Sequence, residues 1–244
     1  MNAIEIKNVI KYYKIYHDKG ASLKEKLLFV KRNKYEKRLV LDDVSFEVKK
    51  GEAIGLIGKN GCGKSTILKL IARIIYPNSG TVTVNGRVSS MIELGAGFHP
   101  DMTGRENIFI NASIFGLSKK EIEDNIDSII AFSELGEAID TPVRTYSSGM
   151  YMRLAFAVAV HVSADILLVD EILAVGDWSF QKKCIAKLKE IQQQGTTIVI
   201  VSHALSQIED ICDRSIWICD GHIRMMGSPK EVHEEYIKYN KGEV

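Results

Sequence analysis

The sequence predicts an α/β fold with a mostly parallel, buried β-sheet, and three observations point to it. Short β-like runs recur along the chain and are separated by longer stretches with helical periodicity. The last three runs are rich in Val, Ile and Leu, as expected of strands that are covered on both faces. The 244 residues, 45% of them hydrophobic and 26% charged, suffice for one large domain with a well-buried core.

The predicted elements fall into two regions. The β-like runs are residues 3–6, 44–48, 53–58, 81–86, 165–170 and 196–203. Between about 98 and 162 the pattern is mostly helical, and Thr103 and Ser118 are each followed three residues later by Glu, which is typical of a capping box at a helix start. We therefore expect a single domain, 1–244, in which a helical subdomain (about 98–162) is inserted into a core formed by 1–97 and 163–244.

One early segment, residues 17–38, is strongly basic. It holds eight Lys or Arg against three Asp or Glu. One interpretation is a solvated surface hairpin. The other is a patch that contacts a membrane protein or anionic lipid headgroups. We expect this segment to be an insertion into the core.

Composition argues against several classes of protein. A formal net charge of +1 does not fit a general nucleic-acid binder, so we expect no nucleic-acid partner. No apolar run approaches the roughly 18–20 residues that span a bilayer, and the first residues lack the pattern of a secretory signal. The four cysteines are widely spaced and match no zinc or disulfide framework. We therefore expect reduced thiols in a cytoplasmic protein.

The stretch from Gly58 to Thr66 is a P-loop, because its Gly-x-x-x-x-Gly-Lys-Ser pattern follows a β-like run and precedes a helical one. Glycines let backbone N–H groups approach phosphates without a Cβ in the way. Lys64 would bring a positive charge to the β- and γ-phosphates, and the Ser65 hydroxyl would ligate Mg²⁺. The predicted nucleotide-binding residues of this loop are Gly58, Lys59, Asn60, Gly61, Cys62, Gly63, Lys64, Ser65 and Thr66.

Cys62 lies inside this loop, where its backbone N–H should face phosphate. One interpretation is a small residue that the loop tolerates. Our hypothesis is a reactive thiol, because a nest of N–H groups and the charge of Lys64 should favour the thiolate.

Two further β-like runs end in polar side chains. The run 165–170 is followed by Glu171, so that two carboxylates, Asp170 and Glu171, stand at the end of an apolar strand. Such a strand is an unfavourable place for two acids unless a cation or a reaction requires them. We expect Asp170 to hold Mg²⁺ through water and Glu171 to act as general base on the attacking water. His203 ends the run 196–203, at the sheet edge where ligands bind, and is predicted to contact the γ-phosphate.

Together these pieces resemble the ATP-binding-cassette (ABC) ATPases over essentially the whole chain. The stretch from Tyr146 to Met150, Tyr-Ser-Ser-Gly-Met, is similar position by position to the family's signature motif, Leu-Ser-Gly-Gly-Gln. The second and fourth residues of the motif, Ser147 and Gly149, are kept, and so is the basic residue that follows it, Arg153. The resemblance implies the ABC ATPase fold: a P-loop core with a mostly parallel sheet, an antiparallel β subdomain and the inserted helical subdomain. It also implies ATP and Mg²⁺ as ligands.

In this family the signature motif caps the γ-phosphate of an ATP held by the opposite subunit's P-loop. With one cassette in the chain, the resemblance implies a head-to-tail homodimer that encloses two ATP molecules. Ser147, Ser148 and Gly149 would then contact nucleotide. The resemblance also places Tyr13 on the adenine, with Tyr12 as the alternative, and Asp177 in a loop that crosses the dimer interface.

The family's glutamine that senses Mg²⁺ and the membrane partner is replaced by Glu93 in this sequence. An extra carboxylate near a triphosphate would repel it unless that carboxylate ligates the metal or pairs with a cation. We therefore expect Glu93 either to join Ser65 and Asp170 at the metal or to serve transmission to the membrane partner.

Within the family the chain is most similar to the ATPase subunits of bacterial polysaccharide exporters, those for O-antigen, capsule and teichoic acid. The resemblance lies in the stretches 93–108, 145–159 and 170–184 and in the basic insertion. It implies a peripheral protein on the cytoplasmic face of the membrane, bound to an integral permease that carries a glycan or lipid-linked polysaccharide. The chain stops at Val244, which would fit a short-form exporter or part of a longer protein. The alternatives are an ABC transporter for a drug, lipid or small solute, and a soluble ABC protein that acts on DNA or ribosomes.

Overall fold

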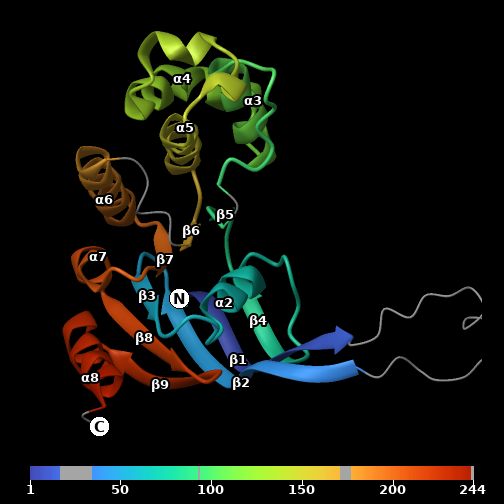
Figure 1. Cartoon of the computed structure of the whole chain (residues 1–244), viewed down its shortest axis with the longest axis vertical. Coiled ribbons are helices and arrows are strands. Elements are labelled where there is room, and N and C mark those ends of the chain that lie inside the picture. Colours follow the sequence, from blue (N-terminus) through green and yellow to red (C-terminus); the bar gives the residue numbers. More distant parts are fainter. Residues whose placement is uncertain (17–34, 93, 171–176, 243–244) are drawn as a thin grey trace, which may run out of the picture.

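The computed structural model describes residues 1–16, 35–92, 94–170 and 177–242. Glu93 and Glu171, two of the predicted site residues, lie outside these ranges. Two β-sheets form the lower part of the molecule in Figure 1, and a group of helices stands above them.

The smaller sheet is antiparallel and contains β1 (Asn2–Tyr16), β2 (Tyr35–Lys49) and β4 (Ser79–Val84) in the order β2-β1-β4. Its strands alternate buried and exposed residues where they cover the core, as a half-buried sheet requires. Strands β1 and β2 stay paired out to Tyr16 and Tyr35, so they extend as a two-stranded ribbon that leaves the body of the molecule (Figure 1). Both strands are therefore longer than predicted, and residues 35–38, which were assigned to the insertion, belong to β2.

The larger sheet has six strands in the order β5-β6-β7-β3-β8-β9. All pair in parallel except β9, which pairs antiparallel with β8 at one edge. The strands are β5 (Val88–Ser90), β6 (Ile166–Asp170), β7 (Thr197–Val201), β3 (Ala53–Ile57), β8 (Arg214–Cys219) and β9 (His222–Gly227). Every residue of β3 and β7 is buried, in agreement with their unbroken apolar sequences. Strands β5, β8 and β9 were not predicted.

Two hydrophobic cores lie on the two faces of this sheet. Alternate residues of β3 face opposite ways, so that Ile54 and Leu56 pack on one side and Ala53 and Ile57 on the other. Helix α2 (Lys64–Ile71) fills the space between the two sheets. The opposite face is covered by α6 (Trp178–Gln193), α7 (Leu205–Ile211) and α8 (Pro229–Lys241).

The upper helical group contains α3 (Gly104–Ile114), α4 (Lys119–Ser133), two short 3₁₀ turns (Gly136–Asp140 and Val143–Thr145) and α5 (Ser148–Val160). Thr103 and Ser118 cap α3 and α4, and Glu106 and Glu121 complete the two capping boxes, as the sequence predicted. Helix α5 is buried at every position from Leu154 to Val160, because it packs both on the other helices of its group and on α6. Among the described residues, no helix combines the length and the apolar character needed to cross a membrane.

Candidate functional site

The P-loop joins β3 to α2 and forms a cradle for an anion. Gly63 is the N-cap of α2 with φ +112°, and Gly58 has φ +145°, a region that L-residues rarely adopt. A Cβ on Gly58 would lie 2.2 Å from the carbonyl oxygen of Ile218, so the loop has no room for a side chain there. Backbone N–H groups at this helix start are therefore exposed to a ligand.

A cavity of about 330 Å³ opens at this helix start. Its lining consists of Val40, Asn60, Gly61, Gly63, Lys64, Ser65 and Thr66. Nζ of Lys64 donates to the carbonyl oxygens of Gly58 at 2.7 Å and Lys59 at 3.1 Å. The buried lysine therefore holds its charge inside the loop, beside the Ser65 hydroxyl that was predicted to meet Mg²⁺.

The other predicted groups lie at the same edge of the large sheet. Strands β6, β7 and β3 are neighbours and parallel, so their carboxyl ends meet at one edge. Asp170 is the last residue of β6, His203 follows β7 by two residues, and the P-loop follows β3. The structure therefore brings together the three strand ends that the sequence analysis singled out, although β7 ends at Val201 rather than at His203.

The donor set at this edge suits Mg²⁺ bound to a nucleotide. The described residues contain no group of three or more His, Cys, Asp or Glu side chains that could hold a metal by themselves. Mg²⁺ commonly takes one or two protein oxygens and completes its shell with water and phosphate. Ser65 and Asp170 would supply such oxygens.

Cys62 does not have the environment that was predicted for a reactive thiol. Its side chain is buried, and burial raises the pKa of the Cys62 thiol. The positive charge of Lys64 and a hydrogen bond from the backbone of Lys64 both lower the pKa, but these effects are smaller than that of burial. The expectation of a stable thiolate is therefore wrong, because desolvation outweighs the nearby cation.

Tyr13 lies on β1 directly opposite Arg38 of β2. The ladder has a bulge at Val40, between the pairs Lys11–Leu41 and Tyr12–Leu39, and Arg38, Leu39 and Val40 all line a cavity beside the P-loop residues Lys59 to Cys62. Tyr12 pairs with Leu39 and has Nζ of Lys37 at 4.6 Å from its ring centre, so the pairing partners of both tyrosines line this cavity. Tyr13 as the aromatic that meets a base, with Tyr12 as the alternative, stays a prediction.

The signature stretch begins α5, in the helical group. Ser147 is the N-cap, and its hydroxyl accepts a hydrogen bond from the Met150 N–H at 3.2 Å. A cavity of about 610 Å³ opens at this helix start, and the residues lining it are Glu134, Leu135, Ser147, Ser148, Gly149, Met150, Arg153 and Asp177. A Cβ on Gly149 would have the Ser147 hydroxyl oxygen, 3.8 Å away, as its nearest neighbour. The packing of this chain therefore does not require glycine at position 149.

Asp177 is the N-cap of α6 and accepts a hydrogen bond from the Phe180 N–H at 3.0 Å. Its other oxygen lies 2.6 Å from Nη2 of Arg153, on α5. The Phe180 N–H and Arg153 lower the pKa of the Asp177 carboxyl, and burial opposes them. Asp177 is therefore joined to the signature helix as well as to its own helix. Its place in a dimer interface stays a prediction.

The P-loop cavity and the signature cavity share no lining residue. The first lies at the start of α2 and the second at the start of α5. Figure 1 shows these helices in different parts of the molecule, α2 beside the two sheets and α5 in the helical group. Each cavity exposes a helix start that attracts an anion. The chain therefore carries two separate cavities at helix starts.

Glu134 was missed by the sequence analysis. It lies at the C-terminal end of α4 in a left-handed conformation, φ +57°, and its carboxylate contacts Arg153 and Lys183 at 3.1 and 2.8 Å. Since these partners are 19 and 49 residues away along the chain, no local sequence signal joins them.

A P-loop at the carboxyl edge of a mostly parallel sheet, with an acid at the end of one nearby strand and a histidine just after another, defines a nucleotide-binding α/β protein with an inserted helical group. The sequence profile of the ABC transporter family matches residues 41–174. The chain belongs to this family, as one of its ATP-binding and ATP-hydrolysing subunits.

Curated relatives match almost the full chain. An O-antigen export system ATP-binding protein, RfbB, of Klebsiella pneumoniae is 51% identical over 96% of each chain. RfbB of Myxococcus xanthus is 51% identical over 97% of this chain and 56% of its own length. A teichoic acids export ATP-binding protein, TagH, of Listeria innocua is 42% identical over 98% of this chain and 70% of its own length.

Solved structures share the fold at low sequence identity. An ATP-binding subunit of an ABC transporter has a TM-score of 0.77 at 22% identity and covers 96% of this chain and 93% of its own. A dimeric ATP-binding cassette, described as a post-hydrolysis state bound to ADP and phosphate, has a TM-score of 0.75 at 22% identity, covering 93% and 98%. The predicted ABC ATPase fold is therefore confirmed.

Proposed function

We propose that this chain is the ATPase subunit of an ABC transporter that powers the export of a cell-surface polysaccharide of the O-antigen, capsule or teichoic acid type. The observation that carries the proposal is the 51% identity to O-antigen export RfbB over 96% of both chains. The teichoic acid export protein, at 42% identity, supports the same class of cargo.

The hydrolytic site that we propose is composite, and the two separate helix-start cavities of each chain support this proposal. In the head-to-tail homodimer that we propose, Lys64 and the P-loop of one subunit bind the β- and γ-phosphates. Ser147, Ser148 and Gly149 of the other subunit cap the γ-phosphate with helix-start N–H groups. The open space around Gly149 supports this arrangement, since a Cβ would project into the cavity rather than into the chain's own packing.

Hydrolysis in this site depends on the positioning of the reacting groups and on stabilisation of the charge of the transferred phosphoryl group. Mg²⁺, held by Ser65 and through water by Asp170, would neutralise charge between the β- and γ-phosphates. Glu171 takes the proton of the attacking water, and His203 donates to the γ-phosphate. Tyr13 stacks on the adenine. Asp177 crosses to the partner near the capped phosphate.

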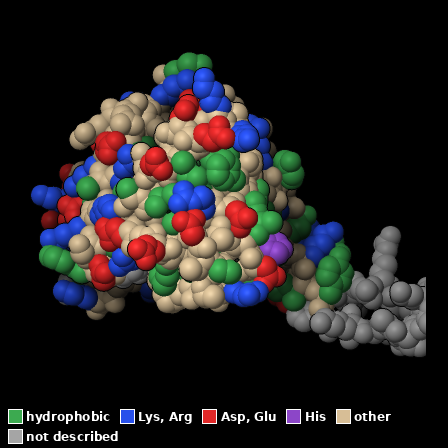
Figure 2. Space-filling model, turned by 90° about the horizontal axis from the view of Figure 1, so that it is seen from above, with side chains coloured by type: hydrophobic (Ala, Val, Ile, Leu, Met, Phe, Trp, Pro, Cys, Tyr) green, Lys and Arg blue, Asp and Glu red, His purple; other side chains and the backbone are tan. Residues whose placement is uncertain are grey.

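A membrane partner completes the proposed assembly. Two ATP molecules draw two subunits together, and hydrolysis with phosphate release parts them. An integral permease converts this motion into transport, so the ATPase sits peripherally at the cytoplasmic face of the membrane. Glu93, at the position of the family's glutamine, either joins the metal or transmits the nucleotide state to the permease. Figure 2 shows acidic and basic side chains interspersed over the face seen from above.

The second candidate is an ABC transporter for a drug, lipid or small solute, whose ATP chemistry would be identical. The identity of the membrane permease distinguishes the two candidates. Pull-down of the native protein from detergent-solubilised membranes, followed by mass spectrometry, should recover a polysaccharide-type permease. Recovery of another class of permease would overturn the proposed cargo and leave the ATPase mechanism intact.

Mixing two inactive variants tests the composite site. A Lys64→Ala chain and a Ser147→Ala chain would each be inactive alone. Their mixed dimer combines the P-loop of the second chain with the Ser147 of the first, which restores one intact site. We expect ATPase activity to reappear on mixing. If mixed dimers form, as shown by differential tags, and stay inactive, the composite site is wrong.

A further inference from the structure

Arg153 joins three helices at the wall of the signature cavity. Its guanidinium lies 2.6 Å from a carboxylate oxygen of Asp177, at the start of α6, and 3.1 Å from one of Glu134, at the end of α4. The guanidinium carbon is also 4.9 Å from the centre of the Phe180 ring. The Arg153 side chain is only 20% exposed, so it is held in place from several sides.

The charged groups that line this cavity are two carboxylates and one guanidinium, Glu134, Asp177 and Arg153. Nζ of Lys183 adds a second cation, 2.8 Å from Glu134. The carboxylates are 45% and 62% exposed, and both belong to the cavity that the γ-phosphate would enter. Without Arg153 they would repel an approaching phosphate, because juxtaposed like charges disfavour association.

We infer that Arg153 is a positioning residue that neutralises Glu134 and Asp177, so that the signature helix can receive the γ-phosphate of ATP bound to a second copy of this chain. This inference rests on the proposed composite site. Arginine suits the role, because its fork of N–H donors holds carboxylates at fixed positions and it keeps its charge at all relevant pH values.

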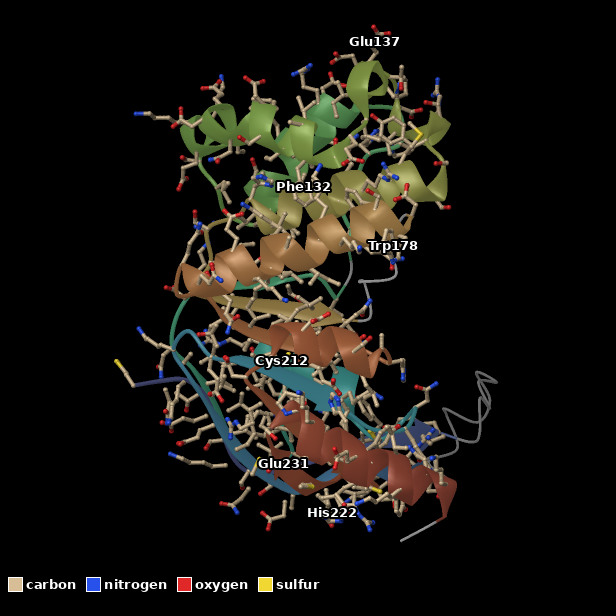
Figure 3. The ribbon with its side chains drawn as sticks, turned by 90° about the vertical axis from the view of Figure 1, so that its left-hand side faces the viewer. Phe132, Glu137, Trp178, Cys212, His222 and Glu231 are labelled. Carbon is tan, nitrogen blue, oxygen red and sulfur yellow. The ribbon has the colours of Figure 1, made fainter. Side chains whose placement is uncertain are left out.

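A purely mechanical role is the alternative. The helical group packs on α6 through Phe132, whose ring lies 5.8 Å from that of Phe180, and Figure 3 shows Phe132 facing α6 and Trp178 at the N-terminal end of that helix. Arg153 would then only tie α4, α5 and α6 together. The two roles predict different effects of removing the two acids in a chain that lacks Arg153. If the role of Arg153 is electrostatic, their removal should restore ATP-driven association. If the role is mechanical, their removal should lower the stability of the protein further.

The test measures ATP-driven association by analytical ultracentrifugation in a Glu171→Gln background, in which hydrolysis is slowed. Arg153→Met should weaken association by roughly 100-fold, as expected for an uncompensated like-charge contact. ATP binding by the separate chain should stay within about twofold, since Arg153 does not line the P-loop cavity. Arg105→Met is the matched control, because Arg105 pairs with Asp140 at 2.8 Å in the same helical group, away from the cavity, and should leave association unchanged.

Two further variants separate charge from mechanics. The triple change Arg153→Met, Glu134→Gln and Asp177→Asn removes the repulsion, and asparagine keeps the N-cap of α6. This variant should regain most of the lost association. The defect of Arg153→Met should also shrink in 0.5 M salt, because charge repulsion is screened and packing is not. Absence of both effects would overturn the inference. Glu134→Gln alone should tighten association severalfold, and unchanged or weaker association would contradict the inference even if Arg153→Met failed to fold.

The outcomes also distinguish this inference from the proposed function. If the Glu171→Gln chain with Arg153 intact does not associate in ATP, the composite site fails. If that chain associates and Arg153→Met associates equally well, only the role of Arg153 is wrong.

Discussion

The ammonium of Lys64, at the start of α2, donates to the carbonyl oxygen of Gly58, at the start of the P-loop, at 2.7 Å. A second bond, to the carbonyl oxygen of Lys59 at 3.1 Å, fixes the side chain further. The lysine is only 5% exposed. The loop therefore holds a cation in place before any nucleotide arrives, which lowers the cost of ordering it on binding.

Replacing Lys64 by Met should remove the nucleotide-dependent part of thermal stability. A ligand at 100 times its Kd stabilises a protein by about 2.7 kcal/mol, which corresponds to roughly 5–10 °C in Tm for a chain of this size. We expect ATP with Mg²⁺ to raise the Tm of the unaltered chain by this amount and to leave the Tm of Lys64→Met unchanged. Differential scanning fluorimetry measures both. An equal rise in the variant would show that Lys64 is not a ligand of the phosphates.

Gly149→Ala should separate stability from function. A Cβ at this position has open space in the chain, with the nearest atom at 3.8 Å. Alanine is also a better helix former than glycine by up to about 1 kcal/mol. The variant should therefore be as stable as the unaltered chain or slightly more so. Its ATPase activity should fall at least tenfold, because the added methyl group occupies the space into which the partner's phosphate is proposed to bind.

Gly95→Ala is the matched control for that variant. Gly95 has φ +79°, and a Cβ there would lie 2.4 Å from the ring of Tyr151, whose hydroxyl donates to the Gly95 carbonyl oxygen at 2.7 Å. Backbone strain and this clash should lower the free energy of unfolding by about 1–3 kcal/mol. Chemical denaturation of both variants checks the contrast. A destabilised Gly149→Ala would show that its loss of activity reflects folding.

Tyr13→Ala should raise the apparent KM for ATP and leave kcat nearly unchanged. Stacking of a base on an aromatic ring contributes about 1–3 kcal/mol, which corresponds to a roughly 5- to 150-fold change in KM. Tyr13→Phe should keep the stacking and the KM. The same changes at Tyr12, on the other face of the ribbon, are the control. A larger effect at Tyr12 than at Tyr13 would reverse the assignment.

Cys62 should react slowly with thiol reagents at neutral pH. Burial raises the pKa of its thiol, and only the thiolate is nucleophilic. The fraction of thiolate, and with it the labelling rate, should therefore rise about tenfold per pH unit below the pKa and still be rising at pH 9. Peptide mass spectrometry after maleimide labelling at several pH values measures this. A rate that levels off below pH 8 would show that Lys64 outweighs burial after all.

Much of the site could be predicted from the sequence, because its parts are local. The P-loop, the strand that ends in Asp170 and the two capping boxes each lie within fewer than ten consecutive residues, and their chemistry depends on residue type and spacing. Apolar runs placed β3, β6 and β7 correctly for the same reason. Strands β5 and β9 were missed because they lie at the two edges of the sheet, where β5 has only three residues and β9 is partly exposed along its length. Strand β8 was also missed, although it is an inner strand of six residues whose centre is buried.

The sequence by itself identified the P-loop and the family to which the chain belongs, since a motif is a short-range pattern. Only the tertiary structure decided that burial outweighs Lys64 at Cys62, that Gly149 faces open space, and that one arginine of α5 holds acids from α4 and α6. These properties depend on which distant segments pack together and how much water they exclude. The contacts between distant segments are determined by the whole fold.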